Sequence, residues 1–382
     1  MPVPSSLPAS LDRRSFLALL VALSAQSLLG CSGQNASLTV RSLSGSIPTQ
    51  ILGEFQKFLK QSAGSPTINL SVEPQLQTLF SLLQTWRQAA ETTSVPDVVT
   101  LGDYWLEKAI QQQLIQPIAP DKLKGWAQLP ANWKALVTRN AAGQFDRKGQ
   151  VWGAPYRWGS TVIAYRQDIL RDRKLAPPTD WADLWRLDLR GYISLPDQAR
   201  EAIGLTLKKL GKSYNTQDLS SVTGLTEELR LLHAQVKLYS SDAYQQPLSL
   251  GDTWVAVGWS ADVLSLMQRN PQIAAVVPKS GTALWAELWV RPVQAKAAPA
   301  IADDWMSFCW QPTIATQLSL WSDATSPAVL GIEPKDLAPE LRQNSLLLPD
   351  PAILQTSEFL QPLSAAAVEQ YRAVWRQLRL GS

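Results

Sequence analysis

The chain has 382 residues, of which 45% are hydrophobic and 18% are charged, and its formal net charge is +3. This composition predicts a folded globular protein with room for about two domains, and the lack of a basic block argues against a nucleic-acid partner. A single histidine, His233, stands beside sixteen tryptophans, so a histidine-based metal site is not expected. The sequence also lacks a calcium-loop motif, and we expect no metal and no cofactor.

Residues 1–30 have the pattern of an export signal. Two arginines, which resemble a twin-arginine signal, precede an apolar run at 16–29 that is too short for an ordinary membrane-spanning helix. The run ends in Leu-Leu-Gly-Cys, which resembles a bacterial lipobox, so Cys31 is the predicted site of lipidation. The alternative is an ordinary cleaved signal peptide. Residues 31–37 are polar and would tether the folded body to a membrane surface in the periplasm.

The mature chain opens with short strands that alternate with amphipathic helices. Strands are expected where apolar and β-branched residues cluster, and helices where apolar residues recur at helical spacing. The pattern predicts strands at 37–43, 67–74 and 96–102 and helices at 48–64, 76–91 and 103–115. A segment rich in glycine and aromatic residues, 149–170, is predicted to form a hairpin that leads into a crossing strand.

A second round of alternation follows this segment. The pattern predicts strands at 192–195, 253–259, 273–281 and 283–292, and helices at 179–191, within 194–211, and at 224–236, 260–270 and 299–321, the last broken at Pro312. Alternation of this kind is typical of a parallel α/β sheet with helices on its faces. Two such units joined by crossing strands would bind a ligand at the carboxyl ends of their strands.

The segment 194–211 places a polar head before an amphipathic helix. Ser194 and Asp197 are residue types that cap helices, and Pro196 suits a first helical turn, so we expect Asp197 to cap this helix. Gln198 and Glu201 lie three residues apart, which puts both side chains on one helical face.

Two motifs that resemble catalytic sequences are incomplete. The LGKS at 210–213 lacks the upstream glycine of a phosphate loop and ends a helix instead of opening one. The GWSAD at 258–262 carries an aspartate where a nucleophile elbow needs its second glycine. No catalytic constellation remains, and we do not expect an enzyme.

Four stretches resemble the spermidine/putrescine receptors of bacterial ABC importers. They are VWGAPYRWGSTVIAY (151–165), TDWADLWRLDLRGYISLPDQARE (179–201), TWVAVGWSADV (253–263) and VVPKSGTALWAELWVRP (276–292). The resemblance implies an α/β, two-lobed periplasmic-binding-protein fold of type II. Each lobe would be a mixed, mostly parallel sheet flanked by helices, with the ligand cleft between the lobes. It also implies an ABC transporter permease as partner and hinge closure as the mechanism.

The resemblance implies which residues line the ligand site. Three aromatic residues and two acids match positions that hold the ligand in that family: Tyr104, Trp259, Trp285, Glu201 and Glu287. Aromatic rings there flank the methylene chain and carboxylates hold the ammonium groups. Glu287 takes the place of an aspartate, and its pairing with a lysine or arginine of this chain is the alternative.

Two departures make the implied site less acidic and less aromatic. Gln198 stands where the family has an aspartate, although it can still reach the ligand beside Glu201. Leu43 and Ser46 stand where the family has an aromatic pair. Asp103 is a new acid; we expect it to cap the helix that follows it, and it is also a candidate replacement for the missing charge. A shorter diamine or another amine-bearing solute is therefore a candidate ligand.

The predicted organisation has two discontinuous lobes. Lobe 1 comprises 38–162 and 287–322, and lobe 2 comprises 163–286 and 323–382. We expect a monomer that binds a small cationic solute and passes it to the permease. The alternatives are a receptor for an amino-acid derivative or a sugar, and a structural envelope lipoprotein with a vestigial cleft.

Overall fold

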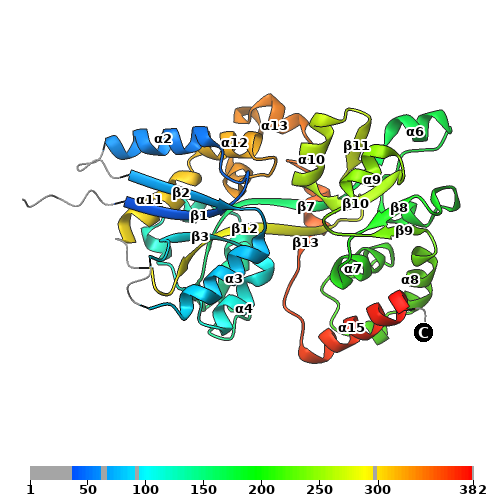
Figure 1. Ribbon diagram of the computed structural model, residues 1–382, viewed down its shortest axis with the longest axis horizontal. Coiled ribbons are helices and arrows are strands. Elements are labelled where there is room, and N and C mark those ends of the chain that lie inside the picture. The colour runs from blue at the N-terminus through cyan, green and yellow to red at the C-terminus, as the bar shows by residue number, and fades with distance from the viewer. Residues whose placement is uncertain (1–36, 62–66, 91–93, 296–298, 381–382) are drawn as a thin grey trace, which may run out of the picture.

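The computed structural model describes residues 37–61, 67–90, 94–295 and 299–380 (Figure 1). The predicted signal peptide, Cys31 and most of the predicted tether lie outside these residues. Within the described ranges, no helix is both long and apolar enough to cross a membrane.

A mixed sheet runs through the described part of the chain, with the main strand order β2-β1-β3-β12-β7-β10-β8-β9. The strands are β1 (Ser37–Leu43), β2 (Thr67–Glu73), β3 (Val98–Gly102), β4 (Ile115–Gln116), β5 (Thr138–Arg139), β6 (Gln150–Val151), β7 (Ala154–Arg166), β8 (Ile193–Leu195), β9 (Val236–Tyr239), β10 (Val255–Trp259), β11 (Ile273–Val276), β12 (Ala283–Pro292) and β13 (Glu358–Phe359).

Helices cover both faces of this sheet. They are α2 (Thr49–Lys60), α3 (Leu76–Arg87), α4 (Leu106–Gln111), α5 (Ala131–Val137), α6 (Gln167–Asp172), α7 (Ala199–Lys209), α8 (Leu225–His233), α9 (Gln245–Leu250), α10 (Ser260–Arg269), α11 (Pro299–Cys309), α12 (Pro312–Trp321), α13 (Pro339–Gln343), α14 (Pro351–Thr356) and α15 (Ala365–Leu380).

Two parallel groups of strands are joined by two long strands. β1 pairs in parallel with β2 and β3, and β8 pairs in parallel with β9 and β10. Between the groups lie β7 and β12, which pair with each other in antiparallel register. We call β1–β3 with α2, α3, α4 and α11 the β1 half, and β8–β10 with α7, α8, α9 and α10 the β8 half (Figure 1). β7 and β12 connect the two halves.

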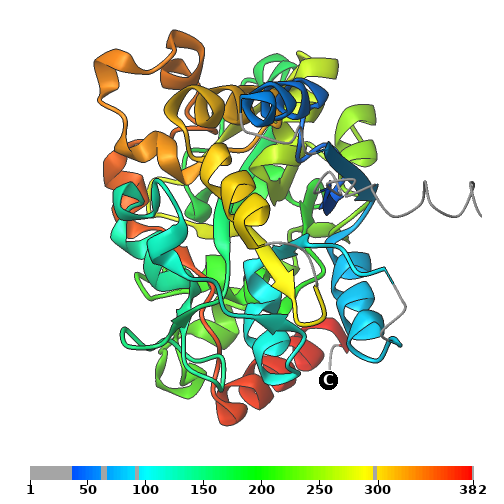
Figure 2. The same cartoon turned by 90° about the vertical axis from the view of Figure 1, so that its left-hand side faces the viewer.

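Each half has an apolar core on both faces of its sheet. In the β1 half, α2 buries Ile51, Phe55 and Leu59, which recur at helical spacing, and Phe55 packs edge-on against Trp305 with ring centres 4.9 Å apart. α3 and α4 cover the opposite face (Figures 1 and 2). In the β8 half, α9 and α10 cover one face and α7 and α8 the other. The site described below lies between these cores.

Many of the elements predicted from periodicity are confirmed. The strand at 37–43 is β1, the helix at 48–64 contains α2, and the stretch at 299–321 forms α11 and α12 with the break before Pro312. The hairpin at 149–170 is wrong, because β6 pairs with β5 and not with β7. The helix at 103–115 is also wrong in extent. It divides into a 3₁₀ turn (η2, Asp103–Trp105), the short α4 and the start of β4.

The polar head of α7 differs from its prediction. The helix begins at Ala199, the cap position is Gln198, and no side chain caps it. Asp197 forms an ion pair with Arg379 instead. Arg379 belongs to α15, which packs its apolar face on α7 and α8. The carboxylate of Asp197 thus pairs with a distant residue and does not cap the helix. The predicted capping role of Asp197 is therefore wrong.

Candidate functional site

The site is built on alternate residues of the two connecting strands. Arg157, Gly159 and Thr161 of β7 share one face because side chains alternate along a strand. Glu287 pairs with Arg157 and Trp285 pairs with Gly159 in the antiparallel register, so these two β12 side chains lie on the same face. One face of the connecting strands therefore carries an acid, a base and an aromatic ring in a row.

Glu287 is fully engaged by its neighbours. Its side chain is buried, with 2% of its surface exposed. Arg157 lies 3.3 Å from Oε1, and the hydroxyl of Tyr156 donates to Oε2 at 2.6 Å. Two consecutive β7 residues reach one carboxylate because the register shifts between Glu287 and Leu288, which leaves Tyr156 as an extra residue, a β-bulge. The pairing of Glu287 with an arginine, the alternative to a ligand role, is thus present.

The ring of Trp285 packs closely against a glycine. A Cβ atom at Gly159 would lie 2.3 Å from the Trp285 ring and 2.4 Å from the Ser260 hydroxyl, so this position requires glycine. The guanidinium carbon of Arg157 lies 5.9 Å from the centre of the same ring. The ring is partly exposed and thus available to a ligand.

Glu201 is a buried acid in the first turn of α7. Its side chain is 4% exposed, and Thr161 of β7 donates a hydrogen bond to Oε2 at 3.2 Å. Burial raises the pKa of Glu201 to about 7, and the charge of Asp103 adds to the rise, while Thr161 and Arg200 oppose it. The carboxyl group is therefore easily protonated while no cation is bound.

Asp103 approaches the same region from the β1 half. It is the first residue of η2, and no side chain caps this turn, so the predicted capping role is wrong. Its Oδ1 accepts a hydrogen bond of 3.1 Å from the backbone N–H of Ala286 on β12. Burial raises the pKa of Asp103 to about 7, although the Ala286 hydrogen bond and the charge of Arg139 lower it.

The remaining predicted site residues lie at the edge of this group. Tyr104 is 65% exposed and meets Trp105 edge-on. Trp259 ends β10, is partly exposed, and packs edge-on against Tyr244 with ring centres 6.5 Å apart. Gln198 is exposed.

Sequence reasoning missed Tyr156, Arg157 and Thr161. All three lie in the stretch 151–165, where a charged residue among apolar and aromatic neighbours was the available signal. We call Asp103, Glu201, Trp285, Glu287 and Arg157 the junction cluster.

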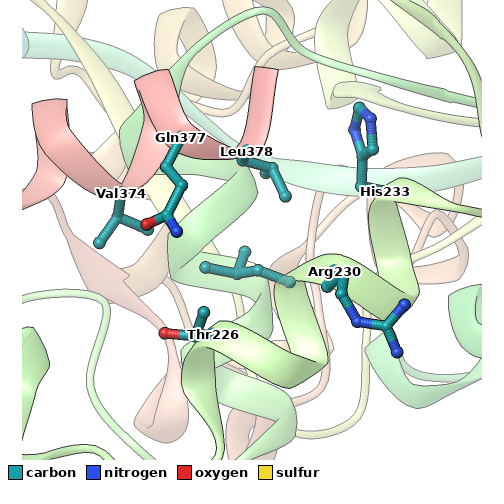
Figure 3. Close-up of a pocket in the computed structure, with 7 residues that line it drawn as sticks. Thr226, Arg230, His233, Val374, Gln377 and Leu378 are labelled. Atoms are coloured by element: carbon teal, nitrogen blue, oxygen red, sulfur yellow. The ribbon is translucent and has the colours of Figure 1, made fainter. Parts of the chain in front are cut away.

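A pocket of about 300 Å³ lies elsewhere, between α8 and α15 (Figure 3). Leu229, Val374 and Leu378 provide most of its apolar wall, and Arg230 and His233 lie at its side. None of the seven residues that line it is acidic, so it does not suit a cation. In the described residues, no group of three or more histidine, cysteine, aspartate or glutamate side chains could hold a metal ion.

Comparison with known proteins finds relatives of this chain along most of its length. The family model "Bacterial extracellular solute-binding protein" matches residues 93–356. The spermidine/putrescine-binding periplasmic protein of Escherichia coli is 26% identical over 335 residues, which cover 88% of this chain and 89% of that protein. The putrescine/agmatine-binding protein of Pseudomonas aeruginosa is 28% identical over 207 residues, 50% of this chain and 54% of that protein.

Solved structures share the fold. The substrate-binding protein PotD of a Streptococcus pneumoniae spermidine/putrescine ABC transporter superposes with a TM-score of 0.77 at 19% identity, covering 90% of this chain and 99% of that one. The TpPotD lipoprotein of Treponema pallidum gives 0.67 at 17% identity, covering 90% and 99%. These likenesses confirm the predicted periplasmic-binding-protein fold. Because the family model spans more than half of its residues, the chain belongs to the bacterial extracellular solute-binding proteins, a family of receptors and not of enzymes.

Proposed function

We propose that this protein is the substrate receptor of an ABC importer and that it binds a small polyamine-like cation at the junction cluster. One observation carries the proposal. Asp103 of the β1 half bonds to β12 at Ala286 and Glu201 of the β8 half bonds to the neighbouring β7 at Thr161, and among the described residues neither carboxyl group forms an ion pair. The names of the relatives point to the same ligand class.

An ammonium group is the natural partner of such a pair of acids. Burial makes each carboxylate costly to ionise, and a bound cation offsets that cost through charge-assisted hydrogen bonds. Trp285, Trp259 and Tyr104 offer aromatic faces that can cover methylene groups and attract the cation. The ligand in this proposal is therefore a primary amine with an aliphatic body.

Closure of the two halves would complete the site. In our proposal 38–162 with 287–322, and 163–286 with 323–382, move as two lobes about β7 and β12. Asp103 and Glu201 then approach the ligand from opposite sides and exclude water. Small-angle scattering should show a more compact particle with ligand than without it.

The proposal extends to the cellular setting. Lipid at Cys31 would hold the protein at a membrane surface in the periplasm, as a monomer that delivers its ligand to a permease. Because Cys31 lies outside the described residues, this part rests on the lipobox sequence alone.

Titration calorimetry of the mature protein tests the ligand class. The titrants are a diamine, spermidine, an amino-acid derivative and a neutral sugar, each at the same pH and ionic strength. We expect heat of binding with the amines and none with the sugar. Binding of the sugar alone would overturn the proposal, and so would the absence of binding with all four.

A further inference from the structure

Arg157 is a buried cation inside a region that we assign to a cationic ligand. Only 5% of its surface is exposed, although it stands in the middle of β7, where a charged side chain is costly unless it is paired. Its ion-pair partner is Glu287, at 3.3 Å. The guanidinium also lies near the face of Trp285, 5.9 Å from the ring centre.

Glu287 has both carboxylate oxygens in use. Oε1 meets Arg157 and Oε2 accepts the hydroxyl hydrogen of Tyr156. The charge of Arg157 also affects two further acids. Burial raises the pKa of Asp262 and of Asp323, and Arg157 opposes the rise in both. Arg157 is therefore the cation that holds Glu287, the acid at this end of the junction cluster.

The other end of the junction cluster, near Thr161 of β7, differs in its charged groups. Glu201 contacts β7 at Thr161, four residues beyond Arg157, whereas Asp103 bonds to Ala286, next to Glu287 on β12. In the described residues neither Glu201 nor Asp103 has an ion-pair partner. Four residues of strand span about 13 Å. An extended four-carbon diamine is shorter than this distance, whereas a triamine such as spermidine approaches it. A longer ligand anchored at Glu201 would pass Asp103 and bring its far ammonium group toward Glu287.

We propose that Arg157 is a specificity-determining residue that occupies Glu287 in place of a ligand's far ammonium group. The receptor then holds a short diamine at Glu201 and Asp103 and prefers it to longer polyamines. This inference rests on the proposed function, since it assumes that an amine binds at the junction cluster. It assigns a role to a residue of the connecting strand and explains why an arginine is buried there.

Calorimetry with putrescine and spermidine tests the inference on the wild type and three variants. The wild type should bind spermidine no more tightly than putrescine. Arg157→Met removes the cation and keeps much of the side-chain volume, so spermidine affinity should rise at least tenfold relative to putrescine. Arg157→Lys keeps the charge and should keep the wild-type ratio. The double variant Arg157→Met/Glu287→Gln also lacks the acid, so it should not show this rise in spermidine affinity.

The possible results distinguish a failure of the proposed function from a failure of the role assigned to Arg157. If neither amine binds to the wild type, the proposed function fails together with this inference. If both amines bind and Arg157→Met leaves their ratio unchanged, only the role of Arg157 is overturned. Should Arg157→Met fail to fold, the double variant replaces it, because both members of the ion pair are then removed together. The double variant should keep the wild-type ratio, and a tenfold relative loss of spermidine binding would show that Glu287 holds the ligand and overturn the inference.

Discussion

Thr161 on β7 donates a hydrogen bond of 3.2 Å to the buried carboxyl group of Glu201 on α7. This contact joins the first turn of a helix in the β8 half to a strand that both halves share. It fixes one carboxylate oxygen and leaves the other for a ligand.

Glu201→Gln should weaken the binding of cationic ligands about tenfold to hundredfold, because a charge-assisted hydrogen bond contributes about 1.5–3 kcal/mol. The glutamine oxygen can still accept from Thr161, so the fold should persist, as circular dichroism would show. Glu227→Gln is the matched control, since Glu227 is an exposed acid paired with Arg230 on α8. Calorimetry compares the two variants, and equal affinities would contradict the assigned role of Glu201.

Ligand affinity should rise between pH 5.5 and 8. Asp103 and Glu201 both have a pKa of about 7 in the free protein, and each must be ionised to hold a cation. Below pH 7, affinity should therefore fall by up to about tenfold per pH unit for each carboxylate. Asp103→Asn and Glu201→Gln should each make ligand affinity less dependent on pH, because each variant removes one titrating proton. An affinity independent of pH in the wild type would be incompatible with binding by these two acids.

Glu201 should also lower the stability of the ligand-free protein as pH rises. Its pKa is about 7 in the folded state and near the ordinary glutamate value of 4.5 in the unfolded state, so the folded state holds the proton more tightly. The contribution of Glu201 to the free energy of unfolding is thus highest below pH 4.5 and is lost as pH rises toward 7. Urea denaturation at pH 4.5 and 7.5 measures it. Between pH 4.5 and 7.5, Glu201→Gln should lose less stability than the wild type. An identical loss would show that the pKa of Glu201 is not raised.

Gly159→Ala should displace Trp285 and weaken ligand binding about tenfold. The new Cβ atom would lie 2.3 Å from the ring, closer than any normal contact, so the indole must move off β7. Gly53→Ala on α2 is the control, because its Cβ would meet nothing within 4 Å. That change should stabilise the protein by about 0.5–1 kcal/mol and leave binding unchanged. Wild-type affinity in Gly159→Ala would exclude Trp285 from the binding surface.

Cys31→Ser should release the protein from membranes. The prediction rests on the lipobox sequence that ends at Cys31. Fractionation of cells followed by a high-salt wash measures the membrane-bound share of wild type and variant. A variant that remains with the membrane after the wash would show that another contact holds it there.

The sequence was sufficient for elements that depend on local patterns. Helical spacing of Ile51, Phe55 and Leu59 predicted α2, and Pro312 marked the break between α11 and α12. It was insufficient where partners are distant in the chain. Asp197 has the residue type of a helix cap, but its partner, Arg379, comes from the last helix.

The same limit applies to the candidate site. Resemblance indicated Glu201, Trp285 and Glu287, yet the partner of Glu287 could not be read from spacing. Arg157 meets Glu287 only because β7 and β12 pair in one particular register, and it lies 130 residues earlier in the sequence. Local chemistry cannot specify such a pairing.

The bulge at Tyr156 sets the phase of everything that follows it on β7. Residue alternation has a period of two, so one residue more or fewer exchanges the two faces of a strand. If β7 paired regularly here, with Pro155 still opposite Leu288 and Tyr156 opposite Glu287, Trp158 and Ser160 would turn toward the ligand. Gly159 and Thr161 would then face the core, and Glu201 would lose its hydroxyl partner. The single extra residue at Tyr156 therefore determines which β7 side chains face the ligand.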